Sequence, residues 1–134
     1  WCMRSHRRAK ADQVAGVEAD DGDPGNWVLC VTFTIRPECA EEFIAIVSAV
    51  IDQMRHEPNF ISTTLCHDPD QPGRFMLFES WRSRAAFIAV DMGRAYRLPY
   101  ETRLAEIQSG ERDIQEWRQL RANFRLSVGA SAQS

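Results

Sequence analysis

The sequence lacks a surplus of basic residues, because 16 lysines and arginines are outnumbered by 19 aspartates and glutamates. A protein that binds nucleic acid ordinarily carries a positive excess that neutralises phosphates. The chain also lacks any apolar run approaching the ~18 residues that indicate a membrane-spanning helix. We therefore expect neither a nucleic-acid partner nor a membrane partner.

Cysteine is scarce and irregularly spaced. The four cysteines, at positions 2, 30, 39 and 66, match neither a disulfide scaffold nor a zinc ribbon. Cys66 and His67 are neighbours whose side chains would point to opposite faces of a strand, so they make a poor metal pair, and we expect no metal site. The first ten residues are basic but no apolar stretch follows them, so we expect no secretory signal there. These features favour reduced thiols and a cytoplasmic location.

The composition is otherwise that of one globular domain, with 44% hydrophobic and 26% charged residues in a chain of 134. Residues 1–26 are rich in charge and poor in apolar side chains, and residues 127–134 (SVGASAQS) are mostly small or polar. Such segments cannot offset the entropy lost on ordering. We expect a mobile N-terminal extension over 1–26, a folded domain over 27–126 and a flexible tail over 127–134.

Three segments rich in β-branched and aromatic residues, 28–35, 60–66 and 74–81, predict strands. A turn cluster, DPDQPG, joins the second and third of these strands in a hairpin. The segment 111–126 is ambiguous, because its apolar spacing fits a helix whereas the order of elements favours a strand. We predict a strand at Asp113–Arg121.

Two helices are predicted between the strands. Apolar residues at helical spacing define the first helix: Phe43, Val47, Val50 and Met54. Ser83 is placed to cap the second. The apolar side of that second helix is expected to comprise Phe87, Val90, Leu98, Leu104 and Ile107. Pro99 lies within it, which predicts a kink or two helical pieces.

The resulting order, βαββαβ, is that of the ferredoxin-like α+β fold, a four-stranded antiparallel sheet with two helices on one face. The third strand is apolar on both sides, with Phe75 and Leu77 facing one way and Met76 and Phe78 the other. Because the helices can cover only one face, the second apolar face predicts a partner. A homodimer formed through the sheet face is the simplest one.

Two stretches of this domain carry motifs of a known family. RPECAEEFIAIVSAVIDQMRHEPNF ends in the helix stop RHEP (55–58), and DPDQPGRFMLFESWRSRAAFIAV contains ESWRS (79–83) at the end of the hairpin. Together they resemble the antibiotic biosynthesis monooxygenase (ABM) family over about residues 28–108. The resemblance implies a dimeric α+β barrel like that of quinol monooxygenases, with a small-molecule pocket between sheet and helices.

The resemblance further implies an enzyme that oxidises a quinol-like or polycyclic aromatic molecule with O2 and without a metal, flavin or haem cofactor. Such a site needs a base, donors for an oxyanion and a dry apolar pocket. Two alternatives stay open: a catalytically silent accessory protein that binds a small molecule, and an isomerase of a small metabolite. Haem degradation, which one branch of the family performs, is disfavoured because only Trp81 of its three characteristic residues is present and Tyr100 replaces the histidine.

The candidate catalytic residues are Trp81, Glu79 and His67. Trp81 could line a pocket and donate its indole N–H, or it could be an ordinary core tryptophan. Glu79 shares its sheet face and would be either a base with a raised pKa or the ion-pair partner of an arginine at 74, 82 or 84. His67 ends the second strand and is either a base at the pocket mouth or an exposed loop residue.

Four aromatic residues are candidates for substrate binding: Tyr96, Tyr100, Phe33 and Phe78. The two tyrosines are one helical turn apart, so they share a face. Their hydroxyl groups could donate hydrogen bonds to a quinone oxygen, or the rings could pack beneath the kink at Pro99.

Three charged residues of the second helix are weaker candidates for a functional site. Many ABM proteins carry a histidine where this chain has Val90, and the neighbouring Asp91 would point about 100° away from that position. Arg94 and Arg97 could attract an acidic substrate, but the pattern is more typical of a solvated helix face.

Overall fold

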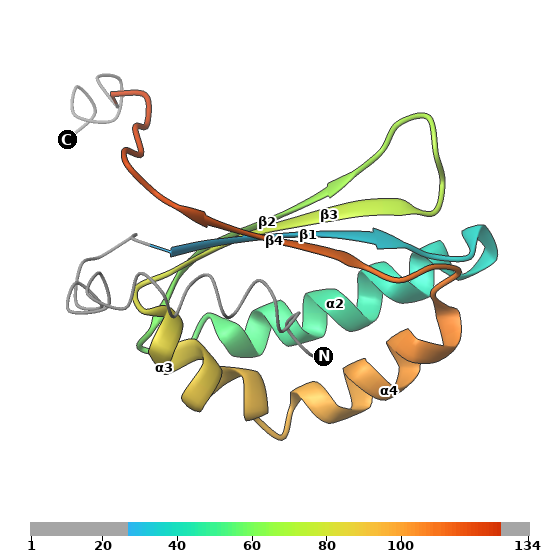
Figure 1. Ribbon diagram of the computed structural model, residues 1–134. Coiled ribbons are helices and arrows are strands. Elements are labelled where there is room, and N and C mark those ends of the chain that lie inside the picture. The colour runs from blue at the N-terminus through green and yellow to red at the C-terminus, as the bar shows by residue number, and fades with distance from the viewer. Residues whose placement is uncertain (1–26, 127–134) are drawn as a thin grey trace, which may run out of the picture.

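The computed structural model of the chain describes residues 27–126 (Figure 1). The extension and tail expected at 1–26 and 127–134 lie outside the described residues. The strands are β1 (Trp27–Thr34), β2 (Phe60–His67), β3 (Arg74–Trp81) and β4 (Asp113–Arg118). The α-helices are α2 (Ala40–Met54), α3 (Arg84–Ala89) and α4 (Arg97–Ile107), and two short 3-10 helices are η2 (Pro37–Cys39) and η3 (Asp91–Gly93).

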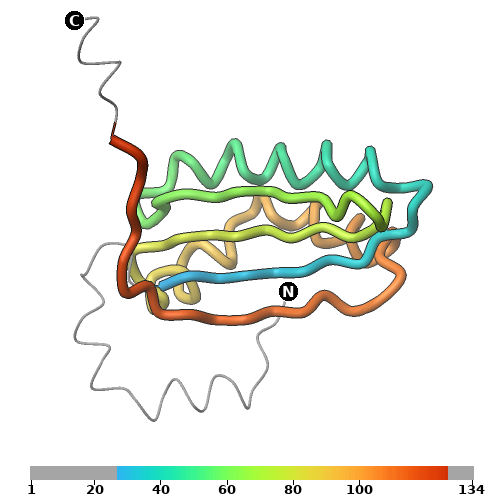
Figure 2. Tube along the Cα trace, turned by 90° about the horizontal axis from the view of Figure 1, so that it is seen from above, coloured from blue at the N-terminus to red at the C-terminus, as the bar shows by residue number. Residues whose placement is uncertain are grey.

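The four strands form one antiparallel sheet in the order β2-β3-β1-β4. All helices lie on the same side of it, as the view along the sheet and the view from above both show (Figures 1 and 2). The ferredoxin-like α+β fold is therefore confirmed. The strand predicted over 113–121 is also confirmed, although it ends three residues earlier than expected.

The core fills the space between the sheet and the helices α2, α3 and α4. The buried face of α2 consists of the residues that the spacing predicted: Phe43, Val47, Val50 and Met54. Phe43 packs between Phe33 and Phe75, with ring centroids 4.9 and 4.7 Å away. In the described part of the chain, no helix has both the length and the apolar character needed to cross a membrane.

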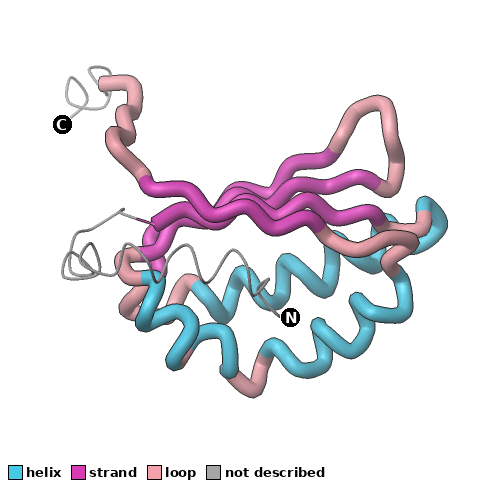
Figure 3. Tube along the Cα trace, viewed as in Figure 1, coloured by secondary structure: helices cyan, strands magenta, loops and turns pink. Residues whose placement is uncertain are grey.

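The second helical region is divided, as predicted, but not at Pro99. The break lies over residues 90–96, between α3 and α4 (Figure 3). Pro99 is the third residue of α4, where a helix tolerates proline because the first N–H groups have no intrahelical acceptor. The break also changes which residues face the core, so Val90 and Leu98, expected on the apolar side, are 46% and 67% exposed.

The hairpin loop between β2 and β3 is fixed to the end of β1 by a close backbone contact. The Ile35 N–H donates to the Gly73 carbonyl oxygen over 2.7 Å. A Cβ atom at position 73 would lie 1.9 Å from the Ile35 carbonyl oxygen. Only glycine permits this approach, which explains the residue that closes the turn cluster.

The outer face of the sheet, opposite the helices, is not covered by any element in residues 27–126 (Figure 3). Phe78 on β3 and Trp117 on β4 are 42% and 57% exposed on this face. After β4 the chain leaves the sheet, and Leu120 and Phe124 are each 89% exposed. The sheet is therefore apolar on both sides, as the sequence of the third strand predicted.

Candidate active site

A small cavity lies between the inner face of the sheet and the helices. Its volume is about 20 Å³, which is room for about one water molecule. Side chains of β1, β3 and α2 form an apolar wall, and side chains of α4 and the loop before β4 form a polar one. The lining residues are Val31, Phe33, Val47, Val50, Met54, Leu77, Glu79, Arg97, Tyr100, Glu101 and Arg112.

Glu79 is the carboxylic acid that β3 places deepest in this region, with 4% of its surface exposed. Burial raises its pKa, because a charged carboxylate loses its hydration there. The positive charges of Arg97 and Arg112 and the Trp81 N–H act in the opposite direction without cancelling the effect of burial. A carboxyl with a raised pKa accepts a proton more readily than an ordinary carboxyl.

Trp81 holds this carboxyl in place. Its indole Nε1 donates to Glu79 Oε1 over 2.8 Å, and the ring is fully buried. Phe60 and Phe87 pack edge-on against the indole at centroid distances of 5.4 and 4.8 Å. Trp81 is therefore a core residue, and it does not line the cavity as the first interpretation expected. Its N–H contacts the cavity only through the Glu79 carboxyl.

The arginines considered as ion-pair partners of Glu79 are engaged elsewhere or lie apart from it. Arg74 pairs with Asp68 at the hairpin loop, over 3.1 Å. Arg84 pairs with Glu116 on β4, over 2.5 Å. The cations that influence Glu79 come from α4 and the loop before β4, which are distant in sequence.

His67 is not brought to the cavity. It lies at the loop end of the hairpin, exposed to solvent. Its Nε2 is hydrogen-bonded to the Pro72 carbonyl oxygen over 2.8 Å, and its ring stacks on Phe75 at a centroid distance of 4.3 Å. Glu79 is paired with Thr63, four positions along β2 from His67, so the imidazole is too far along the strand to share the site.

Two of the four aromatic candidates line the cavity and two do not. Phe33 and Tyr100 are both lining residues, and burial raises the pKa of the Tyr100 hydroxyl. Phe78 lies on the outer face, because alternate residues of β3 point to opposite sides of the sheet. Tyr96 lies outside the cavity, and its hydroxyl donates to Glu57 Oε2 over 2.7 Å.

Arg97 lines the cavity, although the sequence interpretation favoured a solvated helix face for it over a role in attracting an acidic substrate. It is 6% exposed, so its assignment to a solvated helix face is wrong. Its Nε donates to the Asp91 carbonyl oxygen over 2.9 Å, and its guanidinium carbon lies 5.2 Å from the centroid of the Phe87 ring. Its Nη2 is buried and has no hydrogen-bond partner among residues 27–126. Only the position of the helix break turns this arginine inward, and no sequence signal gave that position.

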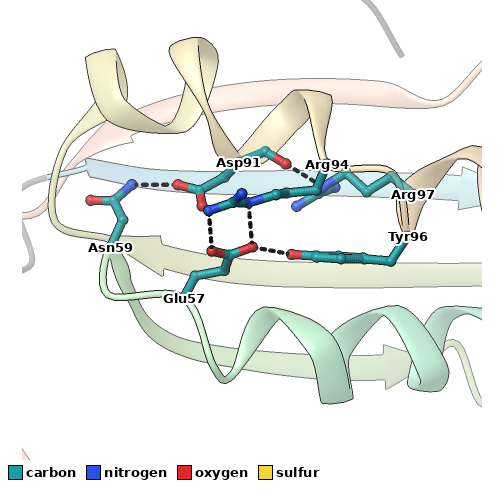
Figure 4. A network of polar contacts seen from close by, with 6 residues as sticks. All are labelled: Glu57, Asn59, Asp91, Arg94, Tyr96 and Arg97. Atoms are coloured by element: carbon teal, nitrogen blue, oxygen red, sulfur yellow. Dashed lines mark hydrogen bonds and ion pairs between the residues drawn. The ribbon is translucent and has the colours of Figure 1, made fainter.

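A polar network ties the break between α3 and α4 to the turn after α2 (Figure 4). Glu57 accepts two hydrogen bonds from Arg94, over 3.0 and 3.1 Å, and one from Tyr96. Although burial opposes the change, the hydrogen bonds from Tyr96 and Arg94 lower the pKa of Glu57. The sequence indicated Glu57 only as part of a helix stop.

Asp91 is the buried acid of this network, with 2% of its surface exposed. Asn59 Nδ2 donates to Asp91 Oδ2 over 3.1 Å (Figure 4). Burial raises the pKa of Asp91, and the negative charge of Glu57 adds to the effect. Because Arg97 Nε donates to the Asp91 carbonyl oxygen, the network helps to position the Arg97 guanidinium at the cavity.

The mouth of the cavity is formed by an ion pair. Arg112 Nη2 donates to Glu101 Oε1 over 2.5 Å, and both residues line the cavity. Their side chains are 17% and 19% exposed, in contrast to the buried residues further in. This pair therefore lies between the cavity and solvent.

Comparison with known proteins agrees with this architecture. SnoaB, a cofactor-independent oxygenase from Streptomyces nogalater, superposes with a TM-score of 0.64 at 16% identity, over 73% of this chain and 96% of that one. Rv0793 from Mycobacterium tuberculosis superposes with a TM-score of 0.64 at 25% identity, over 72% of this chain and 96% of that one. An uncharacterized protein from Synechocystis sp. is 37% identical over 59 residues, which are 44% of this chain and 40% of that protein.

The family model of the antibiotic biosynthesis monooxygenases matches residues 27–95, from the start of β1 to the break before α4. This range includes both motifs from which the resemblance was inferred, as well as Glu79 and Trp81. It stops short of Arg97, Tyr100 and Arg112, which form the polar wall of the cavity. The chain belongs to the antibiotic biosynthesis monooxygenase family.

Proposed function

We propose that this protein is a cofactor-independent monooxygenase that oxidises a quinol-like or polycyclic aromatic molecule with O2. The observation that carries the proposal is the buried Glu79 carboxyl, with its raised pKa, at a cavity that has an apolar wall from β1, β3 and α2 and a polar wall that includes Arg97. The similarity of the fold to SnoaB, described as a cofactor-independent oxygenase, supports the reaction class. Fold alone does not determine activity, so the proposal depends on the site.

In this mechanism Glu79 removes a proton from the substrate, and Trp81 keeps the carboxyl oriented. The deprotonated substrate is electron-rich and reduces O2 directly. A carbon–oxygen bond forms at the activated ring carbon, and the resulting peroxide anion takes the proton back from Glu79 to give a hydroperoxide. Loss of water then leaves one oxygen atom in the product and the other in water, with all four electrons supplied by the substrate. A site that excludes bulk water would protect the reactive intermediates from side reactions.

Substrate binding must enlarge the cavity. About 20 Å³ is far below the roughly 300 Å³ or more of a pocket that holds a small organic ligand. The Glu101–Arg112 pair is the partly exposed part of the wall, whereas the opposite wall is packed core. We propose that the substrate enters by separating this pair.

We further propose that a second copy of the chain covers the outer face of the sheet, with Phe78 and Trp117 at the contact. Their exposure on an apolar sheet face supports this arrangement. Cys30, Cys39 and Cys66 are free thiols, in keeping with the cytoplasm as the proposed location.

A silent binding protein is the second candidate function, and the small volume of the cavity is the observation that favours it. An isomerase is the third, because a buried carboxylate beside a cation can also shift a proton without O2. Measuring O2 uptake and substrate loss with a panel of quinols and anthrones separates the three. An oxygenase consumes O2 and substrate together and stops under anaerobic conditions. An isomerase converts the substrate anaerobically, whereas a silent protein binds the substrate without converting it.

A further inference from the structure

Arg97 carries a buried donor that the folded chain leaves unused. The residue is 6% exposed, and its Nη2 finds no acceptor among residues 27–126. A buried donor without a partner is destabilising, and natural proteins rarely retain one without a use. Because Arg97 lines the cavity, the group that completes its hydrogen bonding can come from a ligand.

The guanidinium is held rigidly enough to act as a fixed binding group. Its Nε donates to the Asp91 carbonyl oxygen, and its Cζ lies over the Phe87 ring, 5.2 Å from the centroid. Asp91 is in turn bonded by Asn59 from the turn after α2 (Figure 4). These contacts fix one side of the guanidinium, so a ligand would not have to order a mobile side chain.

The charges around the cavity favour binding of an anion to Arg97 when Glu79 is protonated. The charged or titratable groups that line it are Glu79 from β3, Arg97, Tyr100 and Glu101 from α4, and Arg112 from the loop before β4. Glu101 and Arg112 neutralise each other at the mouth. Glu79 and Arg97 are left as the inner acid and the inner cation. Once Glu79 has taken a proton, Arg97 has no counter-charge inside the cavity.

We propose that Arg97 is the oxyanion-binding residue of this site, and that its ligand is an aromatic molecule with an acidic phenol or enol oxygen. The negative charge passes from Glu79 to the substrate oxygen as the proton moves the other way, and Arg97 Nη2 donates to that oxygen. This inference deepens the proposed function and rests on it for the direction of proton transfer. Arg97 lies outside residues 27–95, the range that the family model matches.

The test uses two quinones that are already oxidised and so do not react. The probe is 2-hydroxy-1,4-naphthoquinone, which is an anion at neutral pH, and its matched neutral control is the 2-methoxy ether. Binding is measured by quenching of tryptophan fluorescence. The wild-type protein is expected to bind the anion more tightly than the ether, and Arg97→Gln is expected to lose roughly 10- to 100-fold in anion affinity with little effect on the ether.

Two further variants separate anion binding from a structural role. Arg97→Lys keeps the charge and is expected to restore part of the preference. Glu79→Gln mimics the protonated acid, so it is expected to bind the anion at least as tightly as the wild type. Arg103→Gln is the matched control on the same helix, because Arg103 is exposed and pairs with Glu42 and Glu106. It should leave both affinities unchanged.

The proposal is overturned if the wild type binds neither probe, shows no preference for the anion, or keeps its preference in a folded Arg97→Gln variant. It is also overturned if Glu79→Gln binds the anion much more weakly than the wild type. Anion binding that depends on Arg97 in a protein that consumes no O2 would sustain the site and refute the oxygenase. O2 uptake that depends on Glu79, without an anion preference, would sustain the oxygenase and refute the anion site at Arg97.

Discussion

The indole N–H of Trp81 donates to the Glu79 carboxyl over 2.8 Å, and both side chains are buried on the helix-facing side of β3. The two residues are separated by one position in the strand, so the pleat alone brings them to the same face. This hydrogen bond favours the ionised carboxylate and opposes the increase in pKa that burial causes. The pair therefore sets the pH at which Glu79 can act as a base.

Trp81→Phe removes this N–H while keeping an aromatic ring. The Glu79 pKa should rise further, so the acidic limb of the activity profile should move to higher pH. The loss of a buried hydrogen bond and of ring volume should lower the free energy of unfolding by about 1–3 kcal/mol. Activity against pH and urea unfolding measure the two effects.

Trp27→Phe is a matched control for that variant. Trp27 is also buried and also donates to a carboxylate, Glu116 Oε1, over 3.2 Å, but neither residue lines the cavity. The control should lose stability without moving the pH profile. An equal shift of the profile in both variants would contradict the role given to Trp81.

Glu79→Gln should lower kcat/KM by roughly 10²- to 10⁴-fold, because it removes the proposed general base. Glu116→Gln is the control, since Glu116 is a partly buried carboxylate on the neighbouring β4, paired with Arg84. It should lose stability and keep its activity per folded molecule. Initial rates of O2 uptake, corrected for the folded fraction, distinguish the two variants.

The wild-type pH profile should have an acidic limb above the ordinary glutamic acid pKa of 4.5. In the proposed mechanism Glu79 must be ionised to accept a proton. kcat/KM should therefore rise as the pH rises through the raised pKa of Glu79. A profile that stays flat down to the ordinary pKa range would show that Glu79 is not the base.

Asp91→Asn tests the buried acid of the network. Its pKa is higher in the folded state than its ordinary 3.8, so its contribution to stability is complete below that value and is lost as the pH rises through the raised pKa. Asparagine mimics the protonated form. The variant should therefore lose less stability than the wild type between about pH 4 and pH 8.

Urea unfolding across that pH range measures the effect, and Asp52→Asn on the exposed side of α2 is the control. The contribution of Glu57 to stability has the opposite pH dependence to that of Asp91. Because the pKa of Glu57 is lowered, its contribution is lost as the pH falls through that lowered value in both proteins. An Asp91→Asn curve parallel to that of the wild type would contradict the assignment.

Phe78→Lys tests the outer face. A lysine at the centre of an apolar interface would have to be desolvated, so the variant should be monomeric while the wild type is a dimer. Leu98→Lys, on an exposed position of α4, should leave the dimer intact. Native mass spectrometry reads the result directly. A monomeric wild type, or a dimer that survives Phe78→Lys, would place the contact elsewhere.

The sequence predicted most of the fold because its signals were local. Strand periodicity, the apolar spacing of α2, the Ser83 cap and the DPDQPG turn each depend on neighbouring residues, and each was found in the structure. The Glu79 and Trp81 pair was also predictable, since two positions in a strand share a face. Membership of the family followed from the same motifs.

The rest of the site depends on the position of the break between α3 and α4, which local sequence patterns do not determine. The helix breaks over 90–96, where a network from the α2–β2 turn satisfies polar groups, and not at Pro99. That displacement turns Arg97 inward and exposes Val90. His67 was misplaced for a similar reason, because its distance from Glu79 depends on the register of β2 against β3.

The most direct test of the central claim is the fate of labelled oxygen. The purified protein is supplied with an anthrone or quinol that it consumes under ¹⁸O2, without added metal, flavin or haem, and product and water are analysed by mass spectrometry. One ¹⁸O atom is expected in each product molecule and one in water, and turnover should be lost in Glu79→Gln. An unlabelled product, or oxidation that is unchanged in Glu79→Gln, would contradict the central claim.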